Sequence, residues 1–205
     1  MKTKMFYPIV GMAISGIVVF CLVNSANEST AINRESSEMQ DTAKSVTLQP
    51  KKNNFEKLRE IAMSATPEQL GLVIPGNMTI VYGVIMDWEM EDATATTVSY
   101  ETGDASLYLS TGGAVIGGGQ HPNVKKAAKQ FVRLAQTFLD KTVKTEKTPL
   151  PVKDEVKFYL LTNKGIYLGK DVKKNFENNS SIWVTLFGEG NKVLAELRKT
   201  VEMQK

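Results

Sequence analysis

The sequence is poor in the residues that build disulfide frameworks and zinc centres. Its 205 residues include one cysteine, Cys21, and one histidine, His121. A single cysteine excludes an intramolecular disulfide, and a structural zinc site needs about four ligands drawn mainly from Cys and His. We therefore expect neither a zinc centre nor a cofactor, whereas a carboxylate-bound Ca²⁺ or Mg²⁺ ion is not excluded by this count.

An excess of charge of one sign is also missing. The chain carries 25 Lys and Arg against 22 Asp and Glu, which gives a formal net charge of +3. Two of the lysines, Lys2 and Lys4, lie at the extreme N-terminus, and without them the balance is 23 against 22. A nearly neutral domain has no basic surplus with which to neutralise phosphates, so nucleic acid is not expected as a partner.

Charged side chains are absent from Met5 to Asn27, and the densest apolar run covers residues 8–23. A spanning helix needs about 20 apolar residues, and the apolar part of a secretory signal about 7–15. Because the run has an intermediate length, we interpret residues 1–25 as an uncleaved signal anchor, with a cleaved signal peptide as the alternative. Lysines precede the run and acidic residues follow it, which places the remainder on the extracytoplasmic side, or secretes it after cleavage.

The rest of the chain divides into a polar segment and a globular part. Residues 26–54 consist mainly of Ser, Thr, Asn, Glu and Lys. Such a composition cannot bury enough apolar surface to offset the entropy of ordering, so we predict a disordered tether. Residues 55–205 are long enough for one α/β domain.

Apolar periodicity predicts the elements of this domain. A first helix follows residue 53, and a capping box of Thr66 and Gln69, with Pro67 at the first helical position, predicts a short second helix that ends near Gly71. The face of the first helix that we expect to be buried comprises Phe55, Leu58, Ile61 and Ala62. We predict strands at residues 78–90, 91–103 and 105–109, a helix from Pro122, and strands at 156–162 and 166–169. Ser180 or Ser181 then caps a final helix, although its first part, residues 182–187, could instead be a strand. This order predicts a single antiparallel sheet of about five strands with helices packed on it.

That element order resembles the profilin-like and roadblock/longin group of small α/β modules, which implies a protein-interaction platform. A more specific resemblance involves SLYLSTGGAVIGGGQH, with YGVIMDW upstream and VKFYLLT downstream. These segments are similar to an uncharacterised bacterial family whose members carry a Ser-Leu-Tyr strand, a Gly-Gly pair, then Ile-Gly-Gly-Gly and a His before a helix. The resemblance covers residues 81–201 and implies no activity.

The glycine-rich stretch from Ser110 to His121 is the main candidate for a functional site. Its glycines are Gly112, Gly113, Gly117, Gly118 and Gly119. A P-loop would need Lys-Ser/Thr at the helix start, where this chain has Gln-His-Pro, and a dinucleotide fingerprint would need glycine where Pro122 stands. The favoured interpretation is a strand-to-helix passage, with His121 as the cap and Pro122 at the first helical position. Bare backbone there also lets a partner strand or peptide lie against the turn.

Three other chemical readings are open. The helix start exposes N–H groups beside Lys125 and Lys126, which suits an anion. His121 could act as a base towards Ser110 or Thr111. Finally, the carboxylates of Asp87, Glu89 and Glu91, with Asp92 close by, could bind a hard cation or form an acid/base pair, although a solvated hairpin end is favoured.

The sequence therefore predicts a membrane-anchored interaction module that binds a protein partner and is not an enzyme. Its expected contact surface comprises Gly112, Gly113, Gly117, Gly118, Gly119, His121, Lys125 and Lys126. A sensor that binds a small anion at the helix start is the first alternative. A hydrolase that uses His121 is the second.

Overall fold

A computed structural model describes residues 54–91 and 93–202. The expected anchor and nearly all of the expected tether lie outside the described residues. Within the described part of the chain, no helix is both long and apolar enough to cross a membrane.

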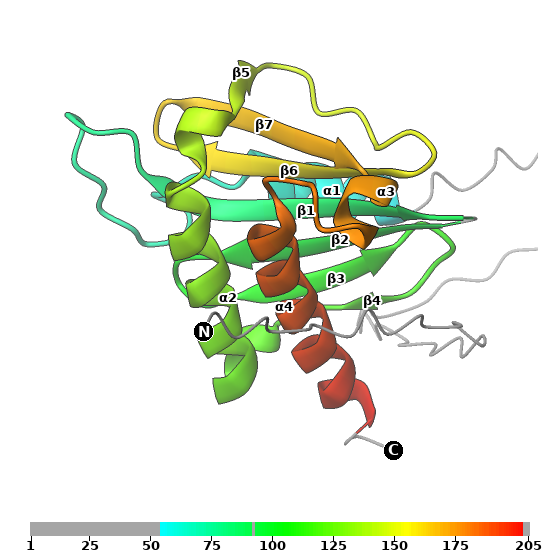
Figure 1. The fold of residues 1–205 in the computed structure, drawn as a ribbon. Helices are drawn as coiled ribbons and strands as arrows, with labels where there is room; N and C mark the ends of the chain where they lie inside the picture. The colour runs from blue at the N-terminus through cyan, green and yellow to red at the C-terminus, as the bar shows by residue number, and fades with distance from the viewer. Residues whose placement is uncertain (1–53, 92, 203–205) are drawn as a thin grey trace, which may run out of the picture.

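The architecture is α+β, with one antiparallel sheet of seven strands in the order β4-β3-β2-β1-β6-β7-β5 (Figure 1). The strands are β1 Val81–Met90, β2 Ala93–Tyr100, β3 Ala105–Leu109, β4 Ala114–Val115, β5 Val143–Thr145, β6 Glu155–Thr162 and β7 Gly165–Val172. The predicted antiparallel sheet is confirmed. The strands beyond the expected five are β4 and β5, two short segments that form the two edges of the sheet.

Strand β1 lies at the centre of the sheet, between β2 and β6. Its residues from Val81 to Asp87 are all buried. The sequence anticipated this position, because the strand carries apolar side chains towards both faces and can therefore lie only between two layers.

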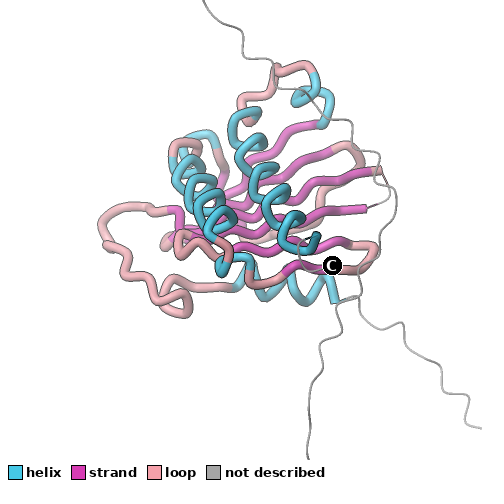
Figure 2. Tube along the Cα trace, turned by 90° about the horizontal axis from the view of Figure 1, so that it is seen from below, coloured by secondary structure: helices cyan, strands magenta, loops and turns pink. Residues whose placement is uncertain are grey.

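Helices cover both faces of the sheet (Figures 1 and 2). Helices α2 (Pro122–Gln136) and α4 (Val184–Glu202) lie side by side on one face, and α1 (Asn54–Ser64) lies on the other. The larger core forms under α2 and α4, where Phe131, Leu186 and Leu197 pack on strand residues such as Phe158. The smaller core forms under α1. A short helix, α3 (Lys173–Glu177), connects β7 to the segment before α4.

Helix α1 begins as expected, and Phe55, Leu58 and Ala62 of the predicted face pack on the sheet. Arg59 and Met63 are buried, whereas Ile61 is mostly exposed. The prediction for Ile61 was wrong because it relied on apolar residues alone. The buried face includes an arginine whose charge is matched by a carboxylate on the sheet.

The predicted capping box is confirmed, but the helix after it is not. The Thr66 N–H donates to Gln69 Oε1 at 2.9 Å, and the Gln69 N–H donates to Thr66 Oγ1 at 3.3 Å. Residues 67–71 form only a turn. Gly71 has φ of +68°, a left-handed conformation that ends any helical path there.

Candidate functional site

The glycine-rich segment forms the edge of the sheet and then enters α2. After β3 the chain turns through Gly112 and Gly113 and forms β4. Strand β4 pairs with β3 through Val115 opposite Leu107 and Ala114 opposite Tyr108. A single 3-10 turn, η1 (Gly118–Gln120), then leads to α2. The segment is thus a passage from strand to helix, and it is also the outermost strand of the sheet.

Gly118 is the point where the chain passes closest to the rest of the molecule. The residue is buried. A Cβ atom added there would collide with the Leu197 side chain of α4, and it would lie 2.9 Å from Val124 Cγ1 and 3.1 Å from the Ala105 carbonyl oxygen. Only glycine lets the turn pass between α2, α4 and β3. Because Gly118 is buried, a partner could not contact it without opening this packing.

Of the other four glycines in this segment, one packs against a neighbouring residue and three have no neighbour near the position of a Cβ atom. A Cβ on Gly119 would collide with Asp104. In contrast, Gly112, Gly113 and Gly117 are exposed, and no heavy atom lies within 4 Å of where their Cβ would be. Their φ angles of +105°, +92° and +77° lie in the left-handed region. Between them Ile116 is 62% exposed, so the residues that flank β4 combine bare backbone with an exposed apolar side chain.

The two edges of the sheet differ in chemistry. Segment 110–121, which contains β4, has no Asp, Glu, Lys, Arg or Pro. Strand β5, at the opposite edge, contains Lys144, and Lys141 and Glu146 lie close to it in the chain. Natural edge strands are usually protected from pairing by charged side chains, by proline or by being very short. Strand β4 is short, but its segment has neither charged side chains nor proline to prevent pairing.

His121 and Pro122 take up the predicted positions at the start of α2. His121 is the N-cap residue and Pro122 occupies the first turn. The His121 carbonyl accepts the Lys125 N–H at 2.9 Å, and its own N–H donates to the Gly118 carbonyl at 3.0 Å. The imidazole makes no capping hydrogen bond. His121 thus occupies the N-cap position and its carbonyl accepts the first hydrogen bond of α2, but its side chain caps none of the N–H groups of the first turn.

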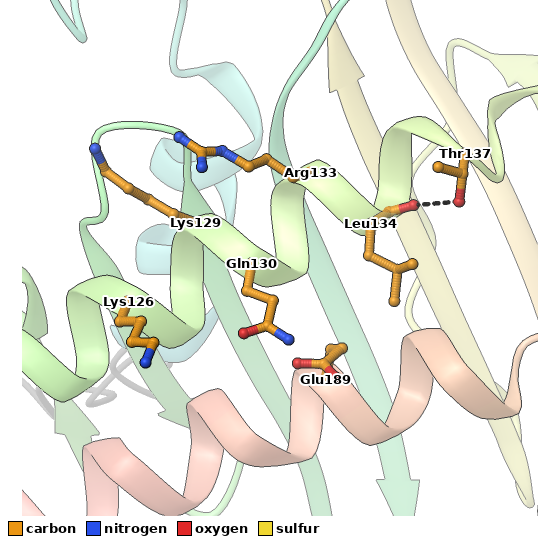
Figure 3. A pocket seen from close by; sticks show the side chains of 7 residues that line it. All are labelled: Lys126, Lys129, Gln130, Arg133, Leu134, Thr137 and Glu189. Atoms are coloured by element: carbon orange, nitrogen blue, oxygen red, sulfur yellow. Dashed lines mark hydrogen bonds between the residues drawn. The ribbon is translucent and has the colours of Figure 1, made fainter.

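Lys125 and Lys126 point in different directions. The Lys125 side chain lies against Gly103 in the turn between β2 and β3. Lys126 instead lines an open groove between α2 and α4 (Figure 3). The side chains of Lys125 and Lys126, either of which could assist an anion at the helix start, thus lie against different parts of the molecule.

The groove between α2 and α4 was not anticipated from the sequence. It has a volume of about 610 Å³ and is lined by Lys126, Lys129, Gln130, Arg133, Leu134, Thr137 and Glu189. Figure 3 shows Gln130 of α2 directed towards Glu189 of α4, whereas Lys129 and Arg133 extend from α2 away from α4. Glu189 pairs with Lys192 at 2.6 Å, and Arg133 pairs with Glu101 at 2.9 Å. Helical periodicity identifies the exposed face of each helix but not which residues of two helices meet.

The described carboxylates near the β1–β2 hairpin, Asp87, Glu89 and Glu91, do not form a group that could hold a cation. Asp87 is completely buried, and its Oδ2 accepts hydrogen bonds from Arg59 Nε at 3.0 Å and Nη2 at 2.6 Å. Glu89 accepts the Asp154 N–H at 2.7 Å, and Asp92 is not described. Among the described residues no group of three potential ligands could hold a metal ion. The favoured reading of a solvated hairpin end was wrong for Asp87, because its partner lies 28 residues away in the chain.

Ser110 and Thr111, the hydroxyl residues considered as partners of His121, lie at the start of the same segment. Ser110 Oγ accepts the Thr94 N–H at 2.8 Å, and the Ser110 N–H donates to the Thr94 carbonyl at 3.0 Å. These two bonds fix Ser110 to β2. It therefore has a structural role at the end of β3.

Comparison with known proteins adds no relative. The chain matches no protein-family model, no curated protein and no solved structure. The resemblances to the profilin-like and roadblock/longin modules and to the uncharacterised bacterial family remain predictions. The function is accordingly inferred from the geometry of the described residues.

Proposed function

We propose that this protein is a membrane-anchored, extracytoplasmic interaction module that takes up an extended strand of a partner protein along β4. In this mode of recognition, main-chain hydrogen bonds supply affinity and side-chain contacts supply specificity. The observation that carries the proposal is the combination of an outermost strand and open glycines at Gly112, Gly113 and Gly117.

The shape of this edge suits an extended chain. The open glycines place no side chain between the backbone of the module and an approaching backbone. Strand β4 itself has only two residues, so pairing must extend along its flanks, where the glycines lie. Ile116 supplies an apolar contact beside the pairing.

Substitution of Ile116 tests this proposal. Ile116→Lys places a charge beside the proposed pairing, and we expect it to abolish co-purification of a partner from membrane extracts. Val143→Lys is the matched control, because Val143 is 73% exposed on the opposite edge strand, β5. Equal loss of the partner in both variants, or in neither, would contradict the proposal. A bulky residue at Gly118 is not a suitable test, since it would disrupt packing instead of a surface.

Hydrogen exchange provides the second readout. Addition of the purified partner should protect backbone amides in residues 112–117, because the new strand accepts and donates hydrogen bonds there. The amides of residues 143–145 should be unchanged. Protection confined to α2 or α4 would instead indicate that the partner binds at the groove.

A second candidate function is recognition of a small anion, and the groove between α2 and α4 is the observation that favours it. Lys126, Lys129 and Arg133 line this groove. If an anion binds there, phosphate should raise the melting temperature, and Lys126→Ala should remove this effect. Lys125→Ala is the control, because Lys125 lies against Gly103 and not in the groove.

A further inference from the structure

Residues 148–152, with the sequence TPLPV, cross the α1 side of the sheet between β5 and β6 without forming a helix or strand. We name this segment the strap. Its backbone is held by side chains of α1 and β6. Arg59 Nη1 donates to the Thr148 carbonyl at 2.8 Å, and Tyr159 Oη donates to the Pro149 carbonyl at 2.5 Å. Lys157 Nζ donates to the Pro149 carbonyl at 3.3 Å and to the Leu150 carbonyl at 3.0 Å.

The donors are buried, whereas the strap is largely exposed. Arg59 is 8% exposed, Lys157 5% and Tyr159 0%. Burial, together with the nearby charge of Asp87, raises the pKa of Tyr159 to about 12, so its hydroxyl stays protonated as a donor. A buried cation needs counter-ions or hydrogen-bond acceptors. Arg59 pairs with Asp87 and Lys157 with Glu155, and the strap carbonyls supply the additional acceptors. The molecule thus contains a preorganised row of three donors, from Arg59, Tyr159 and Lys157.

These contacts have an unusual chemistry. The four hydrogen bonds from the donor row all go to carbonyl oxygens of Thr148, Pro149 and Leu150. The Val152 N–H, at the end of the strap, donates to Glu155 Oε2 at 3.1 Å. Such a pattern tolerates proline, which has no N–H and whose fixed φ favours an extended chain. The apolar side chains of Leu150 and Val152 are exposed. The strap is therefore held mainly through its backbone, and another extended backbone can make the same contacts.

We propose that the donor row of Arg59, Tyr159 and Lys157 is a binding site for short extended peptides with proline at alternate positions, and that the strap occupies this site in the free protein. A partner peptide of this kind binds by displacing the strap. This site is separate from the β4 edge, because it lies on the α1 face over β6. It goes beyond the proposed function and does not depend on it.

Competition by the strap sets the expected affinity. The peptide can bind only to molecules in which the strap is released. The apparent dissociation constant of the peptide is therefore the intrinsic constant divided by the released fraction. A released fraction of roughly 1–10% raises it about 10-fold to 100-fold. A protein without a competing strap should therefore bind the same peptide that much more tightly.

The test uses the full chain with residues 148–152 replaced by a Gly-Ser segment of equal length, and a synthetic peptide that copies residues 147–153 as the probe. Calorimetric titration should show binding at least about tenfold tighter than to the native chain. The same peptide with alanine in place of both prolines should bind more weakly. Absence of binding to the folded replacement variant would overturn the proposal.

Two further variants connect binding to the donor row. Lys157→Met in the replacement background should abolish binding, whereas Lys164→Met, at an exposed lysine in the β6–β7 turn, should leave it unchanged. Equal binding by both variants would overturn the proposal. If the replacement variant does not fold, titration of the native chain decides: excess peptide must shift the NMR signals of Tyr159 and Lys157, and unchanged signals reject the site.

Discussion

Arg59 on α1 and Asp87 on β1 form a buried ion pair, with 2.6 Å between Nη2 and Oδ2. The second carboxylate oxygen of Asp87 accepts the Thr96 hydroxyl at 2.5 Å. This pair fixes α1 on the sheet and orients the guanidinium so that its remaining Nη1 reaches the strap. The Asp87 carboxylate therefore positions both α1 and the strap, which are distant from each other in the chain.

Removal of Arg59 should destabilise the protein strongly. Arg59→Met leaves the Asp87 carboxylate buried without a counter-ion, and we expect a loss of about 3–5 kcal/mol in the free energy of unfolding. Urea denaturation measures this loss. Lys57→Met, at an exposed position of the same helix, is the control and should change the value by less than about 0.5 kcal/mol.

The double variant Arg59→Met/Asp87→Leu distinguishes the cost of an unpaired charge from the contribution of the pair. Removing both charges should recover much of the stability that Arg59→Met loses, because no ion then stays buried alone. A double variant as unstable as the single one would show that the pair itself stabilises the fold.

Gly118→Ala should destabilise the fold without acting at an exposed surface. The added methyl group meets Leu197, Val124 and the Ala105 carbonyl at closer than ordinary contact. Overpacking of this kind costs about 1–3 kcal/mol. Thermal or urea unfolding measures the loss, and an unchanged stability would mean that the turn can move away from α4.

Two glycines of α4 provide an internal comparison. Gly190→Ala should destabilise, because a Cβ there would lie 2.6 Å from Met86 Sδ and 3.2 Å from Phe131 Cζ. Gly188→Ala should stabilise by about 0.4–1 kcal/mol, since no heavy atom lies near the new methyl group and alanine has less backbone freedom to lose. Stability changes of the same sign in the two variants would contradict the packing seen here.

Acid should weaken the protein partly through Glu155. Burial works to raise the pKa of this carboxyl, but hydrogen bonds from Lys170 and the Val152 N–H, with the charge of Lys157, outweigh burial and lower the pKa below its ordinary value of 4.5. A carboxyl with a lowered folded pKa contributes stability that is present above 4.5 and is lost as the pH falls through the folded pKa.

The measurement for Glu155 is the free energy of unfolding as a function of pH. The native chain should lose stability steadily below pH 4.5, and Glu155→Gln should lose less over the same range. Asp154→Asn is the control, because Asp154 is exposed beside Glu155 in the sequence. Parallel curves for the native chain and Glu155→Gln would show that other carboxyls dominate the acid response.

Much of the fold could be read from local patterns. Strand β1 and helix α2 were predicted because their apolar residues repeat at the spacing of a strand buried on both faces and of an amphipathic helix. The cap at His121 and Pro122 and the box of Thr66 and Gln69 followed from the hydrogen bonds that helix starts need. Strand β4 was less visible, since two residues carry no period, and only pairing with β3 defines them as a strand.

The candidate site was only partly predictable. The sequence identified the glycine-rich segment, but it treated Gly118 and Gly117 alike, whereas one is buried under α4 and the other is open. It also grouped Lys125 with Lys126, although neighbouring helical residues point about 100° apart. The groove and the strap site were missed because each combines side chains from elements that are far apart in the sequence.

By itself the sequence determined most of the longer helices and strands, the antiparallel sheet with a central β1, and the start of α2. These features depend on interactions between residues a few positions apart, and such interactions leave a period or a motif in the chain. Only the tertiary structure decided that Arg59 pairs with Asp87, that Gly118 meets Leu197 and that three buried donors hold the strap. Those contacts join residues brought together by burial of the whole sheet, and no local pattern records which distant partner a side chain will meet.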